Sequence, residues 1–138
     1  MSEKKLFSIQ DFNIVEKSET PFDFEPLNAD GDPTGIILSV IGEHSEKVKE
    51  FTRKYFNRQR QQEHLAKKRG KEIVKLIEDD EEFGIDYVAI RLVDWKNISE
   101  PCTFENARIF LTINPEIRKQ VVEVSETASN FTKSKSKI

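Results

Sequence analysis

The sequence predicts an α+β fold for a single domain, residues 1–138, with a small N-terminal β-hairpin or sheet followed by a mostly helical part of about four helices. Strand-like alternation of apolar residues, together with turn-forming residues, is confined to residues 1–42, the β-rich part. Apolar residues at spacings of three and four dominate residues 45–131, the helical part. A chain of this length can bury roughly two thirds of its unfolded surface. One core therefore suffices, and residues 132–138 are expected to be a disordered basic tail.

The strands of the β-rich part are predicted from alternation. Residues 6–15 contain two short alternating patterns and predict a first strand. Phe22 and Phe24 alternate with acidic residues, and residues 35–41 are apolar and rich in β-branched side chains. A turn-rich segment separates these two runs, so we expect a β-hairpin with a long loop.

The loop of that hairpin contains oxygen-bearing side chains at alternate positions, as calcium-binding loops do: Asn28, Asp30 and Asp32. A calcium loop needs glycine where this chain has Pro33 and a bidentate glutamate where it has Ser39. The sequence therefore favours a turn in which the aspartates cap the backbone.

A long helix is predicted from Ser45 to about Lys71. Gly42 ends the preceding strand, Ser45 can cap the helix, and the first turns carry an apolar stripe of Val48, Phe51 and Tyr55. After Phe56 the apolar stripe nearly disappears. The helix therefore either projects into solvent or packs on a partner, and Gly70 can break it.

The middle of the chain is strongly basic. Residues 47–75 contain eleven lysines and arginines against three glutamates, a net charge of +8. A basic helix with interleaved aromatic residues could contact nucleic-acid phosphates. We favour a solvated helix face balanced by the acidic run 79–82, because the chain as a whole carries a net charge of -3 and no nucleic-acid-binding motif accompanies the basic residues.

Three further helices are predicted after this one. The acidic run 79–82 suits a helix start, and residues 85–95, which fit both a helical and an alternating period, are interpreted as its continuation to Trp95. Thr103 is expected to cap the next helix, and Asn114 with proline after it the last one. Their expected apolar faces are Phe104, Ala107, Phe110 and Leu111, then Ile117, Val121, Val124 and Ala128. Trp95, Phe104, Phe110 and Phe131 are interpreted as core aromatics packed on these helices.

Catalytic and metal-binding patterns are not evident. His44 and His64 lie far apart in the sequence, and Cys102 has no motif around it. We therefore expect no enzymatic activity, no cofactor and no metal. A helix N-terminus could lower the pKa of Cys102, but a packing role in its loop is favoured. The single cysteine, the lack of a secretory leader and the lack of an apolar run of about 20 residues predict a soluble cytoplasmic protein that does not contact membranes.

Two blocks within residues 34–131 contain motifs that occur together. The first runs from a Pro-Thr-Gly turn through an apolar strand to a helix opening, and the second contains the stretches T-F-E-N-A and N-P-E-I. In this combination they resemble the tail assembly chaperones of siphophages, phages or prophages with long non-contractile tails. The matching residues all look structural: Gly35, Gly42, Ser45, Trp95, Phe104, Asn106, Pro115 and Phe131.

The resemblance implies a function without catalytic residues. Such a chaperone acts in the cytoplasm of the infected host, assists tail assembly around the tape measure protein and is absent from the finished virion. It also implies a longer product made by translational frameshifting near the end of the reading frame. The implied partners are the tape measure protein and the tail tube protein, with self-association left open. The expected partner surface lies on the long helix: Phe56, Arg58, Arg60, His64, Lys67 and Lys68. The alternatives are a nucleic-acid-binding module using residues 47–75, or a structural minor tail protein.

Overall fold

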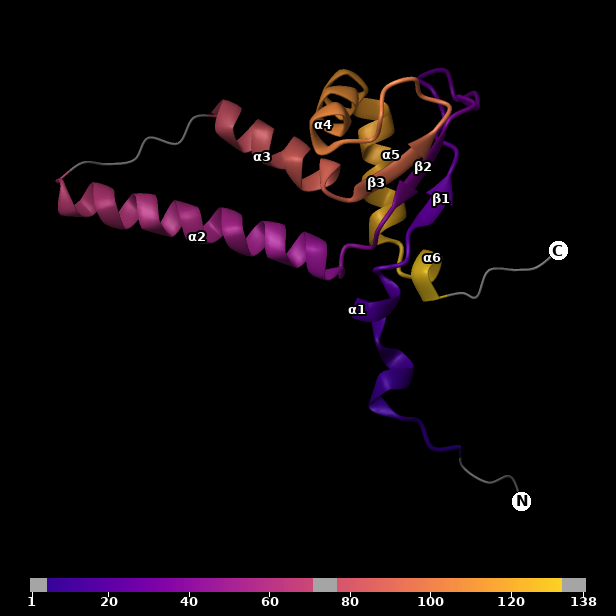
Figure 1. The fold of residues 1–138 in the computed structure, drawn as a ribbon, viewed down its shortest axis with the longest axis horizontal. Coiled ribbons are helices and arrows are strands. Elements are labelled where there is room, and N and C mark those ends of the chain that lie inside the picture. Colours follow the sequence, from indigo (N-terminus) through magenta and orange to yellow (C-terminus); the bar gives the residue numbers. More distant parts are fainter. Residues whose placement is uncertain (1–4, 71–76, 133–138) are drawn as a thin grey trace.

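The computed structural model describes residues 5–70 and 77–132, and these form a three-stranded antiparallel sheet with helices around it (Figure 1). The strands are β1 (Phe22–Phe24), β2 (Ile37–Val40) and β3 (Leu92–Lys96), in the spatial order β1-β2-β3. The helices are the 3-10 helix η1 (Ile9–Phe12) and the α-helices α1 (Ile14–Lys17), α2 (Glu46–Lys68), α3 (Ile77–Ala89), α4 (Phe104–Ile113), α5 (Pro115–Glu126) and α6 (Ser129–Thr132). The predicted α+β class with a mostly helical second part is confirmed.

The predicted hairpin is present and supplies the centre of the sheet. β1 pairs antiparallel with β2, with Phe22 opposite Val40 and Phe24 opposite Leu38. Leu38 and Val40 are fully buried, as alternate residues on one face of a central strand should be. This face of β2 therefore forms the floor of the core.

The hairpin loop is a capped turn, as predicted, but the capping residue differs. The Oδ1 atom of Asn28 accepts hydrogen bonds from the backbone N–H groups of Asp30 (2.9 Å) and Asp32 (3.0 Å). Gly31 has a φ of 86°, a left-handed conformation that glycine adopts without a steric penalty. The asparagine, rather than the aspartates, holds the turn.

The predicted helix over residues 85–95 is wrong in its second half. α3 ends at Ala89, the chain turns, and Leu92 and Trp95 lie in strand β3, opposite Val40 and Leu38 of β2. Local periodicity did not decide this stretch, because β2 presents an edge of backbone groups that only a distant segment can pair. Burial on the face of β2 and backbone pairing together outweigh the local helical pattern. Among the described residues of the part 45–131, β3 therefore interrupts the predicted helical organisation.

The predicted first strand over residues 6–15 is also wrong, because η1 and α1 occupy it. Ser8 and Asp11 form a capping box, in which the Ser8 hydroxyl accepts from the Gln10 N–H (3.2 Å) and the Asp11 carboxylate accepts from the Ser8 N–H (2.8 Å). Asn13 then caps α1 by accepting from the Glu16 N–H (3.1 Å). These local side-chain hydrogen bonds satisfy the backbone and compete with strand pairing.

The C-terminal helices close the core over the sheet. The Thr103 hydroxyl accepts from the N–H of the third helical residue (3.1 Å), so its predicted cap on α4 is confirmed. Asn114 makes no such cap, because its side-chain amide donates to the Phe110 carbonyl (2.9 Å), although proline does begin α5. Trp95 is buried among residues of α4 and α5, as predicted, although it is on a strand. The core residues are Leu38, Val40, Val88, Ala89, Leu92, Trp95, Ala107, Leu111, Ile117 and Val121.

Two expectations for the end of the chain need correction. Ala128 is exposed and lies beyond the end of α5, so it does not extend the apolar face of that helix. Thr132, expected to begin the disordered tail, ends α6 instead. Residues 133–138 of that tail lie outside the described residues.

Candidate partner-binding surface

The base of α2 is fixed by its cap and by one buried side chain. Ser45 is fully buried, and its hydroxyl accepts from the Val48 N–H (3.4 Å), so its predicted capping role is confirmed. The Glu19 carboxylate accepts from the backbone N–H of Glu46, the first residue of α2. Val48 itself is 2% exposed. α2 therefore leaves the body of the protein in a defined direction.

Aromatic side chains extend this anchor along the first three turns. Phe83 of α3 stacks on Tyr55 with ring centroids 3.9 Å apart, and it also contacts Phe51 and Phe56, each at 6.1 Å. Aromatic pairs at separations like those of Phe51 and Phe56 from Phe83 contribute about 0.5–1.5 kcal/mol each beyond their area burial. We call the set Phe51, Tyr55, Phe56 and Phe83 the aromatic cluster. It clamps α2 against α3.

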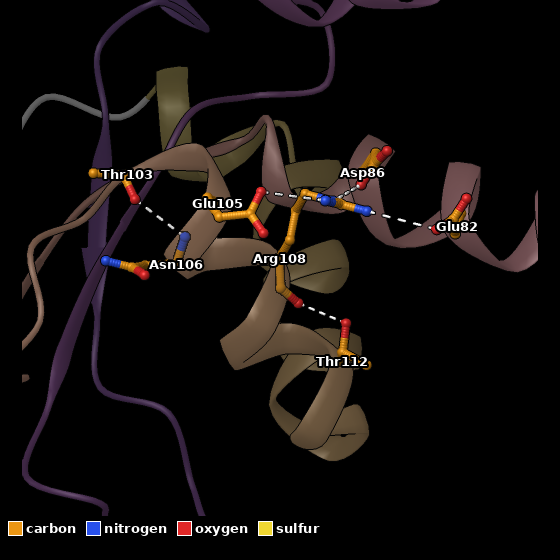
Figure 2. Close-up of polar contacts among 7 residues, drawn as sticks. All are labelled: Glu82, Asp86, Thr103, Glu105, Asn106, Arg108 and Thr112. Carbon is orange, nitrogen blue, oxygen red and sulfur yellow. Dashed lines mark hydrogen bonds and ion pairs between the residues drawn. The ribbon is translucent and has the colours of Figure 1, made fainter.

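Arg108 of α4 ties α4 to α3 through its contacts with Asp86 and Glu82 (Figure 2). Its guanidinium donates to the Asp86 carboxylate of α3, lies 3.9 Å from Glu82 of the same helix, and donates to Glu105 at 3.3 Å. The hydrogen bond and the charge of Asp86 raise the pKa of the Arg108 guanidinium above its ordinary value. The cation therefore persists at any physiological pH, and α3 is tied to the core through α4.

The second half of α2 lies beyond these anchors and projects away from the body (Figure 1). The predicted partner residues Arg58, Arg60, His64, Lys67 and Lys68 are all exposed there. Phe56, at the boundary, is 46% exposed although it belongs to the aromatic cluster. None of the basic side chains in this set has an ion pair with another residue of the described part of the chain. α2 ends at Lys68, and Gly70 just beyond it has a φ of 67°, a left-handed conformation common after helix ends.

Helical geometry divides the predicted partner residues between two faces. Arg60, His64 and Lys67 follow one another at spacings of four and three, so they share one face. Arg58 precedes Arg60 by two positions and therefore points to another side of the helix. Lys49 and Arg53, which were not predicted as partner residues, continue the shared face toward the base and are exposed. The same three-and-four spacing in the sequence could have identified them. We call Lys49, Arg53, Arg60, His64 and Lys67 the basic stripe.

The residues that carry the family resemblance have structural positions. Gly42 lies against α1, Asn106 donates to the Pro101 carbonyl (2.9 Å), and Phe131 is 9% exposed. Gly35 has a φ of 80° and its carbonyl accepts from Asn97, and Pro115 begins α5. Phe104 is the exception to the predicted core aromatics, because it is 43% exposed and lies at the edge of the aromatic cluster, 6.5 Å from Phe51. None of these positions suggests chemistry.

Cys102 is packed rather than activated, and this gives a measurable prediction. Burial raises the pKa of the Cys102 thiol to about 11, with the Asp94 carboxylate acting in the same direction and Lys47 opposing it. Because thiolate is the reacting form, alkylation at pH 7 should be on the order of 100-fold slower in the folded protein than in the unfolded chain. The rate should rise about tenfold per pH unit up to the folded pKa.

Iodoacetamide labelling followed by mass spectrometry, with and without guanidinium chloride, measures both rates. The same pKa shift makes a stability contribution that is present below the unfolded pKa near 9 and lost as the pH rises through about 11. Equal labelling rates in the folded and unfolded protein would contradict the burial of this thiol.

Comparisons with known proteins and searches for other site types add no assignment. No protein-family model, no curated protein and no solved structure matches this chain. Within residues 5–70 and 77–132, no group of three or more His, Cys, Asp or Glu side chains is placed to hold a metal ion. In the same residues no helix is both long enough and apolar enough to cross a membrane.

Proposed function

We propose that this chain is a phage tail assembly chaperone that binds the tape measure protein or the tail tube protein through the basic stripe of α2. It acts in the cytoplasm of the infected host and leaves before the tail is complete. The observation that carries the proposal is the projecting half of α2, which has a fixed base and an exposed basic face. The two-block resemblance to tail assembly chaperones supports the same function.

The proposed binding surface on α2 is ordered before a client arrives. A helical segment without packing partners is marginally stable in water. The cap at Ser45 and the aromatic cluster order α2 from its base. Because α2 is already helical when a client helix packs along it, binding does not have to supply the free energy of forming α2. Exposed cations along the stripe favour a client segment with acidic residues and allow release, because exposed ion pairs are individually weak.

The test is co-expression with the tape measure protein encoded by the same phage, followed by co-purification. Reversing two stripe charges, with Arg60→Glu and Lys67→Glu, should weaken client binding on the order of tenfold, because two complementary contacts become repulsive. The matched control is Lys54→Glu with Arg58→Glu, which changes the charge equally on the other side of α2. The control should bind the client like the wild type.

Two outcomes would overturn the proposal. If the chain neither raises the solubility of the tape measure protein nor co-purifies with it, and mature particles contain it stoichiometrically, it is a structural tail component. If it binds DNA or RNA with steep salt dependence, and both double variants weaken that binding equally, its basic residues neutralise phosphates instead.

A further inference from the structure

The N-terminal segment carries an exposed apolar surface that the proposed function does not use. In residues 5–13, which we call the arm, Leu6 is 91%, Phe7 61%, Ile9 90% and Phe12 70% exposed. Single exposed apolar residues are common on soluble proteins, but four large ones within seven positions form a patch. In Figure 1 the arm runs away from the sheet beyond α1, toward the end marked N.

The arm has a defined conformation although it leaves the body. The capping box of Ser8 and Asp11 closes η1, and Asn13 caps α1 directly after it. The rings of Phe7 and Phe12 lie 5.5 Å apart, so two apolar side chains from either end of η1 are brought together. A segment ordered in this way loses little conformational entropy when it binds.

A second exposed apolar surface lies on α4. Ile109 is 53% and Ile113 72% exposed, one helical turn apart, and among the described residues outside the arm they are the most exposed large apolar side chains. They lie on the side of α4 opposite Ala107 and Leu111, both fully buried. We call Ile109 and Ile113 the α4 patch.

We propose that the arm of one copy of this protein docks on the α4 patch of a second copy. Figure 1 shows the arm and α4 at opposite ends of the molecule, so the two surfaces do not cover each other within one chain. Charge is complementary at one end: Lys5 lies 5.4 Å above the Phe7 ring, and Glu105, one turn before Ile109, has a side chain that is 69% exposed although it accepts from Arg108. The proposal is independent of α2 and of any client.

The area of the arm is sufficient for such a contact. With full surfaces of roughly 200 Å² for large side chains, the exposed fractions of the four arm residues correspond to on the order of 600 Å², of which a segment lying on another surface covers about half. Reciprocal exchange of two arms, counted together with the surfaces that they cover, then buries roughly 1,200 Å², at the lower end of the 1,200–2,000 Å² that specific interfaces bury in total. A two-fold dimer closes both contacts.

Sedimentation velocity across the micromolar range tests the proposal. The wild type should associate reversibly, whereas the arm variant Leu6→Gln with Ile9→Gln and the patch variant Ile109→Gln with Ile113→Gln should each associate at least tenfold more weakly. A matched control, Leu27→Gln with Leu65→Gln, changes leucines that are 44% and 50% exposed elsewhere and should associate like the wild type.

A mixture of the two variants distinguishes the arm–patch contact from general loss of solubility or folding. The patch variant retains its arm and the arm variant retains its patch, so an equimolar mixture restores one of the two contacts. The mixture should therefore form a heterodimer more strongly than either variant self-associates, though more weakly than the wild type dimerises. A wild type that remains monomeric, association that survives in the arm variant, or a mixture without heterodimer would overturn the proposal. Circular dichroism melting curves test whether both variants are folded. Each curve should match that of the wild type at a concentration low enough for the wild type to be monomeric.

Discussion

Replacing Trp95 by alanine should lower the free energy of unfolding by about 3–5 kcal/mol, the range measured for removing large aromatic side chains from cores. Trp95 is 8% exposed, and its ring meets that of Phe110 edge to face with centroids 5.6 Å apart. Its indole N–H also donates to the Glu100 carbonyl (2.8 Å), which holds the loop before α4. The substitution therefore opens a cavity between β3 and α4 and loses a hydrogen bond.

Urea denaturation followed by far-UV circular dichroism measures this effect, since the variant loses the only tryptophan and its fluorescence. Trp95→Phe is the matched control, because it retains a ring against Phe110 and loses mainly the N–H donor. It should cost less than Trp95→Ala, with about 0.5–1.5 kcal/mol for the hydrogen bond itself. If Trp95→Ala has the same stability as the wild type, Trp95 is not in the core.

The second large effect is expected at Gly42, where β2 leaves the sheet beside α1. A Cβ atom there would lie 2.7 Å from the Ser18 Oγ atom, 2.8 Å from the Ser18 Cβ atom and 3.2 Å from a ring carbon of Phe131. The Gly42 N–H donates to the Ser18 carbonyl (2.9 Å), so the two backbones are tied at this distance. Gly42→Ala should therefore destabilise the fold by about 1–3 kcal/mol through overpacking.

Two variants separate this overpacking from a general effect of replacing glycine. A Cβ at Gly84, in α3, meets nothing within 4 Å, so Gly84→Ala should stabilise the protein by about 0.5–1 kcal/mol through helix propensity. Ser18→Gly removes both close atoms and should recover part of the loss when combined with Gly42→Ala. A double variant no more stable than Gly42→Ala alone would show that Ser18 is not the obstacle. Thermal melts of the four proteins provide the comparison.

Local side-chain chemistry was enough to predict the elements whose ends depend on near neighbours. Ser45 and Thr103 cap their helices because the hydroxyl and the N–H it accepts from are three residues apart. The prediction of a helix over the whole of residues 85–95 was wrong, because a distant strand, β2, provides the backbone partners of β3. The prediction of a strand over residues 6–15 was wrong for a local reason, because the caps at Ser8 and Asn13 satisfy backbone groups there without a sheet.

In the candidate partner-binding surface, too, some features could be predicted from local spacing and others depend on tertiary packing. The length of α2, its basic character and the loss of its apolar stripe after Phe56 could all be predicted from spacing along the chain. Helical spacing also places Arg58 and Arg60 on different faces of α2, but the predicted set of partner residues included both. The aromatic cluster at the base of α2 could not be predicted, since it depends on how α3 packs between α2 and α4, with Phe83 on Tyr55 and Asp86 on Arg108.

The sequence by itself determined the helix caps at Ser45 and Thr103, the hairpin, the α+β class and a long basic helix, because each depends on residues within a few positions of one another. Only the tertiary structure decided which apolar residues are covered. Leu38 and Ile113 are both large, apolar and close to turns in the sequence, yet one is fully buried and the other 72% exposed. That difference depends on which elements pack together, and packing joins residues that are far apart in the chain.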